Sequence, residues 1–191
     1  MSQTIHKPWA RATDDEDQPP TIAPAIEKWW EDLEEDRGGR AALRRCRTLD
    51  EALYQPAFHA LFRVALKFQA DHKDAVTSWW GDPLRWAAVA TLAAAIKKDE
   101  RGGFGAQMAR PAGDRRALSE VRLRRFLTTD ETTAGSPQDA REEAWRHARR
   151  IITQLGGAVD LIDVAHGLFD WTPGVRRRWA LAWYAAASTA A

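Results

Sequence analysis

The spacing of apolar residues constrains the fold of this chain more than any other feature of its 191 residues. From Thr21 onward, apolar residues recur at steps of three and four, as in Ile26, Trp29 and Leu33, with acidic residues between them. This period is typical of amphipathic helices, and no segment shows the sustained apolar and polar alternation of strands. We therefore predict an all-α fold, a helical bundle of about eight helices. The patterns run from residue 21 to the glycines at 38 and 39, and then approximately over 40–48, 56–70, 83–98, 115–127, 137–155, 161–169 and 173–188.

Short signals predict where some of these helices begin and end. Ser136 followed by Pro137 and Asp139 reads as a cap, a first-turn proline and an acid three residues after the cap. The pair at 156 and 157 is Gly-Gly, which ends a helix. Thr172 and Pro173 repeat the start signal.

Interruptions in the helical patterns suggest how the chain is divided. Residues 101–114 hold four glycines and a proline among arginines, which predicts a flexible basic loop. We place a boundary near residue 110, between an N-terminal helical lobe (21–110) and a C-terminal helical lobe (111–191). Residues 1–20 contain four consecutive acids and a proline pair, which predict a disordered acidic tail. Residues 128–135 predict a second, shorter polar linker.

Composition and segment lengths narrow the class of protein. At 45% hydrophobic residues the chain can bury a core. The longest apolar stretch, from Trp86 to Ile96, is interrupted by Thr91 and is shorter than the roughly 20 residues that span a bilayer. The first thirty residues lack the apolar core of a signal peptide, and the single Cys46 cannot form an internal disulfide. We expect a soluble, cytoplasmic protein without membrane contact.

The sequence lacks the common catalytic motifs, among them a phosphate-binding G-x-x-x-x-G-K, H-E-x-x-H, G-x-S-x-G and paired C-x-x-C. We predict that the protein is not an enzyme and uses no cofactor. Asp160, Asp163, His166 and Asp170 share a helical face and could in principle bind a divalent ion. We favour the alternative that Asp160 begins a helix and the others are solvated, and so predict no metal site.

Three further reactive side chains have structural interpretations. Cys46 lies between Arg45 and Arg47, which would lower its thiol pKa, but no partner histidine is evident, and we interpret it as structural. His59 and His147 lie inside helical patterns beside apolar residues. A packed or surface role is expected for each histidine.

The distribution of charge points to nucleic acid. The chain has a formal net charge of +1, yet three basic and ten acidic residues precede Arg37, and 25 basic and 17 acidic residues follow from there. Arginines concentrate in helical clusters, and such patches neutralise phosphates. The clusters are Arg37, Arg40, Arg44, Arg45 and Arg47; Arg122, Arg124 and Arg125; and Arg146, Arg149 and Arg150.

Ion pairing on the helix surface is the alternative explanation of these arginines. Glu142 and Glu143 stand at helical spacing from Arg146 and Arg150, so they could neutralise that cluster. The cluster from residue 37 to 47 contains no acid, which favours nucleic-acid contact there. For residues 176–178 we favour ion pairing.

Ten tryptophans could provide stacking surfaces for bases. Six of them fall on apolar helical stripes, where core packing is the better account: Trp29, Trp30, Trp86, Trp145, Trp179 and Trp183. Trp79 and Trp80 precede a Gly-Asp-Pro turn, and we consider them candidates for contact with a partner protein.

The order of several motifs resembles the CasB family, the small subunit of the type I-E CRISPR Cascade surveillance complex. The resemblance covers roughly residues 25–187. It is carried by Trp29-Trp30 with Leu33, the run from Arg40 to Arg45, the run from Pro56 to Leu61, the run from Arg122 to Leu127, Ala148-Arg149-Arg150, and the run from Leu168 to Trp171 followed by Trp179 and Tyr184.

This resemblance implies a non-catalytic, all-α subunit, present as two copies in an RNA-guided antiviral complex with other Cascade subunits. Family members stabilise the R-loop by holding the displaced DNA strand and the guide RNA and target DNA backbone. Matched residue by residue, the family's basic positions fall on Arg44, Arg45, Arg122, Arg149 and Arg150, and more loosely on Arg85.

Together the clusters and the resemblance give nine candidate nucleic-acid-binding residues. They are Arg37, Arg40, Arg44, Arg45, Arg85, Arg122, Arg125, Arg149 and Arg150. The alternative function is a helical protein-scaffold module without direct nucleic-acid contact. The acidic residues 1–20 suggest a further hypothesis, that they mask the basic surface until nucleic acid displaces them.

Overall fold

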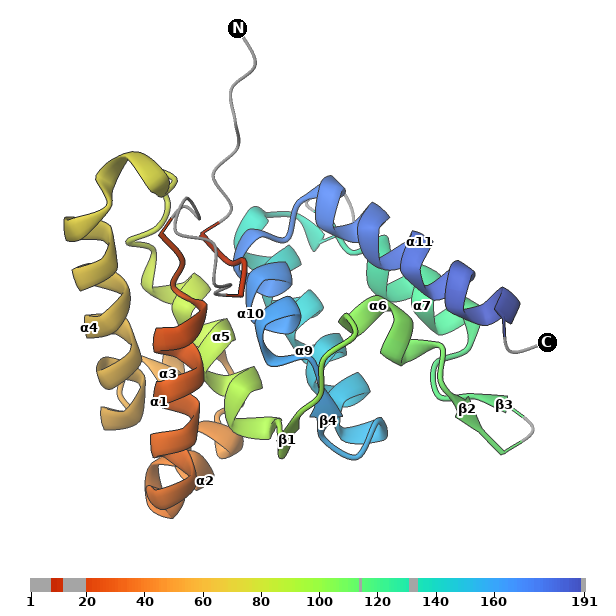
Figure 1. Ribbon diagram of the computed structural model, residues 1–191, viewed down its shortest axis with the longest axis horizontal. Coiled ribbons are helices and arrows are strands. Elements are labelled where there is room, and N and C mark those ends of the chain that lie inside the picture. The colour runs from red at the N-terminus through yellow and green to blue at the C-terminus, as the bar shows by residue number, and fades with distance from the viewer. Residues whose placement is uncertain (1–7, 12–19, 114, 131–133, 190–191) are drawn as a thin grey trace, which may run out of the picture.

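The computed structural model describes residues 8–11, 20–113, 115–130 and 134–189. Within these residues the chain forms ten α-helices, one 3-10 helix and four strands of two residues each (Figure 1). The helices are α1 (Ala23–Glu35), α2 (Arg37–Arg45), α3 (Leu49–Ala52), α4 (Pro56–Asp71), η1 (Lys73–Ala75), α5 (Pro83–Ala95), α6 (Phe104–Met108), α7 (Glu120–Leu127), α9 (Pro137–Gln154), α10 (Leu161–Asp170) and α11 (Pro173–Thr189). The strands are β1 (Lys98–Asp99), β2 (Pro111–Ala112), β3 (Arg115–Arg116) and β4 (Ala158–Val159).

The predicted all-α class is confirmed, with more helices than the sequence patterns suggested. Two of the described helices, α3 and α6, contain four and five residues. Helices this short complete hardly more than one turn, so they show no apolar periodicity. None of the described helices is both long and apolar enough to cross a membrane.

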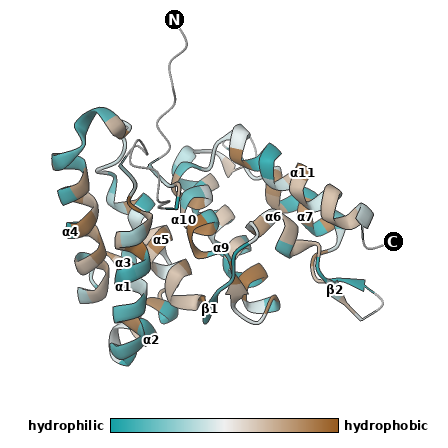
Figure 2. Ribbon diagram, viewed as in Figure 1, coloured by the Kyte–Doolittle hydropathy of each residue, from teal (hydrophilic) through white to brown (hydrophobic). Residues whose placement is uncertain are grey.

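Helix α5 forms the centre of the molecule. Every residue from Trp86 to Ala94 is buried, and the helix packs against α2, α3, α4, α9 and α10. A helix that is apolar on all sides requires this enclosure. Figure 2 shows hydrophobic residues gathered where α5, α9 and α10 meet, whereas α2 is mostly hydrophilic. The one polar side chain in this run, Thr91, donates to the carbonyl of Ala87 at 2.7 Å and accepts from Trp145 Nε1 at 2.8 Å.

Two small strand pairs fix segments that are distant in sequence. β1 pairs in parallel with β4, with Asp99 opposite Val159, and β2 pairs with β3 as an antiparallel hairpin. The parallel pair places Asp99 beside the start of α10, where its carboxylate accepts from the backbone N–H of Leu161 at 2.9 Å. These strands are connectors and leave the helical class unchanged.

The predicted helix boundaries are confirmed where the sequence had clear signals. The Ser136 hydroxyl accepts from the backbone N–H of Asp139 at 3.1 Å, and α9 begins at Pro137. After α9, Gly156 and Gly157 have φ angles of 71° and 83°, which favour glycine. Helix α11 begins at Pro173, as predicted.

The expectation of a flexible loop over residues 101–114 is wrong for most of that stretch. It contains the buried helix α6 and the first strand of the β2–β3 hairpin. Gly105 lies so close to α11 that an added Cβ would stand 2.7 Å from the carbonyl oxygen of Trp179. This glycine therefore permits close packing of two helices, and its presence gave a misleading signal of flexibility. Whether the chain divides into two lobes near residue 110 stays a prediction.

Part of the expected N-terminal tail is docked on the fold. Most of residues 1–20 lie outside the described residues, but Pro8–Arg11 and Pro20 are described. Trp9 is buried, and its ring lies 5.2 to 5.7 Å from those of Trp80, Trp86 and Phe169. The carbonyl of Pro8 accepts from the backbone N–H of Ile22 at 2.8 Å. The acidic residues 14–17, on which the masking hypothesis rests, fall outside the described residues.

The tryptophans mainly build the core, as expected. Trp29, Trp86, Trp145, Trp179 and Trp183 are buried, and Trp30 is half-buried.

The prediction that Trp79 and Trp80 contact a partner protein is wrong for Trp80. Trp80 is buried, and its Nε1 donates to the carbonyl of Ala65 at 2.9 Å, so it offers no surface to a partner. Trp79 is exposed.

Candidate nucleic-acid interface

The nine candidate arginines fall into two groups in the structure. One group is exposed, and no hydrogen bond or ion pair links its guanidinium groups to other described side chains. This group contains Arg37, Arg44, Arg45, Arg122, Arg125 and Arg150. The other group is half-buried and anchored to backbone carbonyls, and it contains Arg40, Arg85 and Arg149. The exposed group is the one available to a phosphate backbone.

Arg40 is tied to the end of α5. Its Nε donates to the carbonyl of Ala94 at 3.2 Å, another nitrogen donates to the carbonyl of Ile96, and Glu34 lies 3.4 Å away. Its guanidinium also lies over the ring of Trp30 at 6.0 Å from the centroid. A cation at a helix C-terminus satisfies carbonyls that have no partner within the helix, so this arginine stabilises the fold.

Arg149 likewise satisfies backbone carbonyls at the C-terminal end of α2. Its guanidinium donates to the carbonyls of Arg44 and of Cys46, the latter at 2.5 Å, and packs over the ring of Trp145. This contact joins the C-terminal end of α2 to the middle of α9, two elements about a hundred residues apart in sequence. Arg149 thereby positions the neighbouring arginines.

The remaining exposed arginines of α7 and α9 surround one hollow. Arg122 and Arg125 from α7 and Arg150 from α9 line a cleft of about 330 Å³ together with His147. A second hollow of about 380 Å³ lies beside it and is lined by Arg47, Arg146, Arg149 and Arg150.

Because Arg150 belongs to both hollows, the basic surface continues from the end of α2 across α9 to α7. We call arginine band the set formed by Arg47, Arg122, Arg125 and Arg150, which line these hollows, together with the exposed Arg44 and Arg45, which end α2 just before Arg47.

Outside the band, some arginines form ion pairs with carboxylates and others do not. Ion pairs engage Arg146 with Glu142 at 2.6 Å and Arg178 with Asp163 at 2.6 Å. Glu143 lies 3.6 Å from His147. Exposed arginines without an ion pair to the described residues also occur at five scattered positions: Arg37, Arg63, Arg101, Arg115 and Arg177. The band is therefore distinguished by being concentrated on three adjoining segments.

His147 lines the hollow beside Arg122, Arg125 and Arg150, and its pKa is lowered. Burial lowers its pKa, Glu143 opposes this, and the positive charges of Arg150 and Arg125 lower it further. His59, by contrast, is exposed on α4.

The carboxylates of Asp160 and Asp163, at the start of α10, accept hydrogen bonds from neighbouring residues. Asp160 caps α10 by accepting from the backbone N–H of Asp163 at 3.1 Å, and it also accepts from Gly103 and from Arg11. Burial would raise the pKa of Asp160, but these donors outweigh it and the pKa is lowered. Asp163 accepts from the backbone N–H of Phe104 at 2.7 Å and from Trp179. These carboxylates hold α6 and α11 in place against α10.

Cys46 is buried, and its thiol pKa is raised. Burial is the main cause and Glu51 adds to it, while Arg149 and Arg45 act in the opposite direction. The lowering that its flanking arginines suggested is therefore wrong, because the side chain packs inward. The structural interpretation of Cys46 agrees with this burial.

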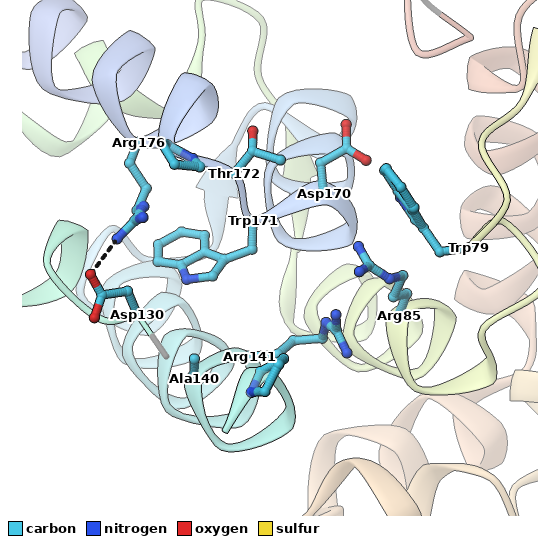
Figure 3. Close-up of a pocket in the computed structure, with 11 residues that line it drawn as sticks. Trp79, Arg85, Asp130, Ala140, Arg141, Asp170, Trp171, Thr172 and Arg176 are labelled. Atoms are coloured by element: carbon cyan, nitrogen blue, oxygen red, sulfur yellow. Dashed lines mark ion pairs between the residues drawn. The ribbon is translucent and has the colours of Figure 1, made fainter. Parts of the chain in front are cut away.

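The sequence reading missed a second basic cleft, which Figure 3 shows. Arg85, which was predicted to belong with the other candidates, lies in this cleft instead, together with Arg141 and Arg176. Arg141 stands at helical spacing from the buried residues Trp145 and Ala148 of α9. A charge on an apolar stripe is the signal that could have identified it.

Comparisons with known proteins give one family and one fold. The family model described as CRISPR-associated protein Cse2 matches residues 39–184, a range that contains the whole arginine band. No curated protein matches the chain. A solved chain from the crystal structure of E. coli Cascade bound to a PAM-containing dsDNA target has a TM-score of 0.60 and 19% sequence identity. The match covers 87% of this chain and 96% of that chain, and at this identity it shows a shared fold.

Proposed function

The chain belongs to the CRISPR-associated Cse2 family, the CasB family that its motifs resemble, and from this premise we propose that it is a subunit of a Cascade-type RNA-guided complex. In this role it stabilises the R-loop by holding the displaced DNA strand and the guide and target backbone against the arginine band. Other Cascade subunits and a second copy of the chain are its proposed partners. The similar fold found in a DNA-bound Cascade structure supports this proposal.

The observation that carries the proposal is the concentration of unpaired charge in the band. Arg44, Arg122, Arg125 and Arg150 are exposed, and ion pairs to described residues do not neutralise them. Neighbouring arginines such as Arg146 are engaged by glutamates. An exposed guanidinium without a carboxylate can form a bidentate contact with phosphate at little cost in lost interactions.

The physical mechanism requires no catalytic step. Exchange of a DNA duplex for an RNA–DNA heteroduplex is nearly balanced in free energy, so modest contacts to one strand can favour the open form. Each arginine that contacts a phosphate releases counterions, and the contacts add along the strand without reading its sequence. We propose that the protein acts by this binding alone.

Equal removal of charge from the band and from elsewhere tests the proposal. The test variant is Arg122→Gln/Arg125→Gln/Arg150→Gln, and the matched control is Arg63→Gln/Arg115→Gln/Arg177→Gln, which removes three exposed charges outside the band that have no ion pair to the described residues. We expect the band variant to bind a single-stranded oligonucleotide at least about tenfold more weakly and its log–log salt slope to fall by about 2, near 0.7 for each phosphate contact. Binding is measured by fluorescence anisotropy over a series of salt concentrations.

The control variant decides whether position matters. Equal losses in both variants would mean that binding follows net charge, and an unchanged salt slope in the band variant would exclude phosphate contact by these residues. Co-purification of each variant with the other subunits and guide RNA tests assembly separately. A band variant that assembles normally and opens target DNA poorly supports the proposed role.

A protein-scaffold role is the second candidate, because two apolar side chains are exposed on packed helices. Val121 on α7 and Leu181 on α11 are both exposed, and the Tyr184 hydroxyl of α11 donates to Glu120 of α7 at 3.0 Å. Such side chains suit contact with another subunit. Flow-through of the protein on single-stranded DNA resin at moderate salt, together with loss of assembly in Leu181→Glu, would favour this function.

A further inference from the structure

The second basic cleft lies apart from the arginine band. It has a volume of about 420 Å³ and is formed by the start of α5, by α9, and by the turn that joins α10 to α11 (Figure 3). Its charged and aromatic walls include Arg85, Arg141, Arg176, Trp79 and Trp171. Its volume falls within the roughly 300–1,000 Å³ of small-molecule sites.

Unsatisfied donors concentrate in this cleft. Among the described residues, four buried side-chain nitrogen or oxygen atoms have no hydrogen-bond partner, and three of them are the Nε atoms of Arg85, Arg141 and Arg176. Buried polar groups nearly always have partners. The Nε of Arg85 lies 3.3 Å from a carboxylate oxygen of Asp82, so the Nε atoms of Arg141 and Arg176 are the clearest exceptions among the residues that line this cleft.

Arg141 is the most poorly compensated of the three. Arg141 is only 8% exposed, no hydrogen bond joins its guanidinium to the described residues, and its ion pair with Asp82 is long, at 3.6 Å. Burial lowers its pKa, and the nearby charge of Arg85 lowers it further, while Asp82 opposes both. A desolvated guanidinium beside a second one requires an anion.

The carboxylates around the cleft already have other partners. Asp82 caps α5 through the backbone N–H of Leu84 at 2.9 Å and lies 3.3 Å from Arg85. Asp130 pairs with Arg176, and Asp170 lies 3.0 Å from His166. Among the described residues, Arg141 is therefore left with the long ion pair to Asp82 alone.

Aromatic rings adjoin these cations. Trp79 is 43% exposed, and the guanidinium of Arg85 lies 5.3 Å from its ring centroid. Trp171 has a φ angle of 39°, which is strained for a residue with a side chain, and its Nε1 donates to the carbonyl of Thr129 at 3.0 Å. Figure 3 shows Trp79 beside Arg85, with Trp171 on the opposite side of the cleft.

We propose that this cleft binds one nucleotide, with its phosphate held by Arg141 and Arg85 and its base against the exposed part of Trp79. A phosphate can accept from two guanidinium groups at once, and a tryptophan stacks on any base. An acidic side chain of a protein would supply the anion but would leave Trp79 uncovered, so the combination favours a nucleotide. The inference does not require that the arginine band bind nucleic acid.

Simple ligands test separately whether the cleft binds a phosphate and whether it binds a base. The probes are deoxythymidine monophosphate, thymidine and inorganic phosphate, titrated by calorimetry into the intact protein. We expect the nucleotide to bind at least about fivefold more tightly than phosphate or thymidine, because stacking and charge act together. A nucleotide that binds no more tightly than phosphate would overturn the proposal.

Two variants assign the binding to the cleft. Arg141→Met should weaken nucleotide binding by about tenfold or more, because it removes a charge-assisted contact. Trp79→Ala should reduce nucleotide affinity to that of phosphate alone. Arg63→Gln, on α4, is the control and should leave all three titrations unchanged. Unchanged nucleotide affinity in both cleft variants would contradict the assignment.

Thermal unfolding separates a binding role of Arg141 from a structural one. Without ligand, Arg141→Met should leave the melting temperature unchanged or raise it, since Asp82 keeps Arg85 and the backbone N–H of Leu84 as partners. A marked fall would mean that the Arg141 ion pair serves stability. If that variant does not fold, the exposed Trp79→Ala variant alone decides whether the nucleotide contacts this cleft.

The source of the nucleotide is distinguished by a further pair of titrations. Arg141→Met should weaken binding of a single-stranded thymidine oligonucleotide if the cleft accepts a nucleotide of a strand, and should weaken only mononucleotide binding if it accepts a free one. The band variant Arg122→Gln/Arg125→Gln/Arg150→Gln should bind the mononucleotide like the unaltered protein. The proposal for the cleft and the proposal for the band are therefore tested independently of each other.

Discussion

At the scale of single residues, surroundings decide what each arginine does. Arg150 is exposed and has no ion pair to described residues, Arg146 is engaged by Glu142, and Arg149, one turn along the same helix, reaches the backbone of α2. These three arginines lie within five positions of one another, yet Arg150 is proposed to bind nucleic acid, Arg146 forms a surface ion pair and Arg149 holds a neighbouring helix. Substitutions in the cluster must therefore be interpreted one residue at a time.

Arg149→Met should destabilise the protein by about 2 to 3 kcal/mol, because two hydrogen bonds from a charged donor to the carbonyls at the end of α2 are lost. The measurement is the free energy of unfolding from urea denaturation. Arg150→Met is the control on the same helix and should lie within about 0.5 kcal/mol of the unaltered protein. Similar values for the two variants would show that Arg149 does not hold α2 in place.

At the scale of secondary-structure elements, the sequence predicts long helices well and short ones poorly. Pro137 and Pro173 begin helices as expected, because proline fits the first turn and the preceding Ser136 and Thr172 can cap it. Helix α6 was missed because its position depends on contacts with α10 and α11, which local sequence does not encode.

Gly105→Ala should destabilise the protein by about 1 to 3 kcal/mol, as overpacking of a close helix contact does. The added Cβ would lie 2.7 Å from the carbonyl oxygen and 2.9 Å from the Cα of Trp179, and backbone atoms cannot easily move. The melting temperature and the urea midpoint measure the effect.

Gly38→Ala is the matched control for this substitution. The nearest atom to an added Cβ at Gly38 is a side-chain oxygen of Asp36 at 3.6 Å, so the methyl group fits. Because alanine favours a helix by up to about 1 kcal/mol over glycine, this variant should be neutral or more stable. A loss of stability at Gly38 equal to that at Gly105 would contradict the role of close packing.

At the scale of the whole molecule, the sequence indicated charged clusters but could not show which of them adjoin. The spacing within α2, α7 and α9 was visible locally, whereas the joining of Arg47, Arg125 and Arg150 into one surface depends on helix packing. The same limit concealed the cleft, because Arg85 and Arg141 come from helices far apart in sequence.

Arg11 links three parts of the molecule through carboxylates. Its guanidinium donates to Glu27 of α1, to Asp99 of β1 at 3.0 Å and to Asp160 at the start of α10, also at 3.0 Å. Arg11→Met should lower the free energy of unfolding at pH 7 by about 2 kcal/mol, since hydrogen bonds between charged groups are lost.

The free energy of unfolding should also depend on pH differently with and without Arg11. The pKa of Asp160 is lowered in the folded protein, so its contribution to stability is complete above its ordinary value near 3.8 and is lost as pH falls through the folded value. Without Arg11 the folded pKa rises, and the variant should lose less stability than the unaltered protein between pH 5 and 3. Urea unfolding at several pH values measures this, and parallel curves would argue against the link.

The burial of Trp9 determines how the chain can be shortened. Truncation at residue 39, where the family match begins, would delete α1 and Trp9 and expose the rings of Trp80, Trp86 and Phe169 to water. A shortened chain of this kind would aggregate or be degraded by proteases, and its failure would say nothing about nucleic acid. The effect of the acidic segment is better measured by replacing Asp14, Asp15, Glu16 and Asp17 with their amides in the intact chain.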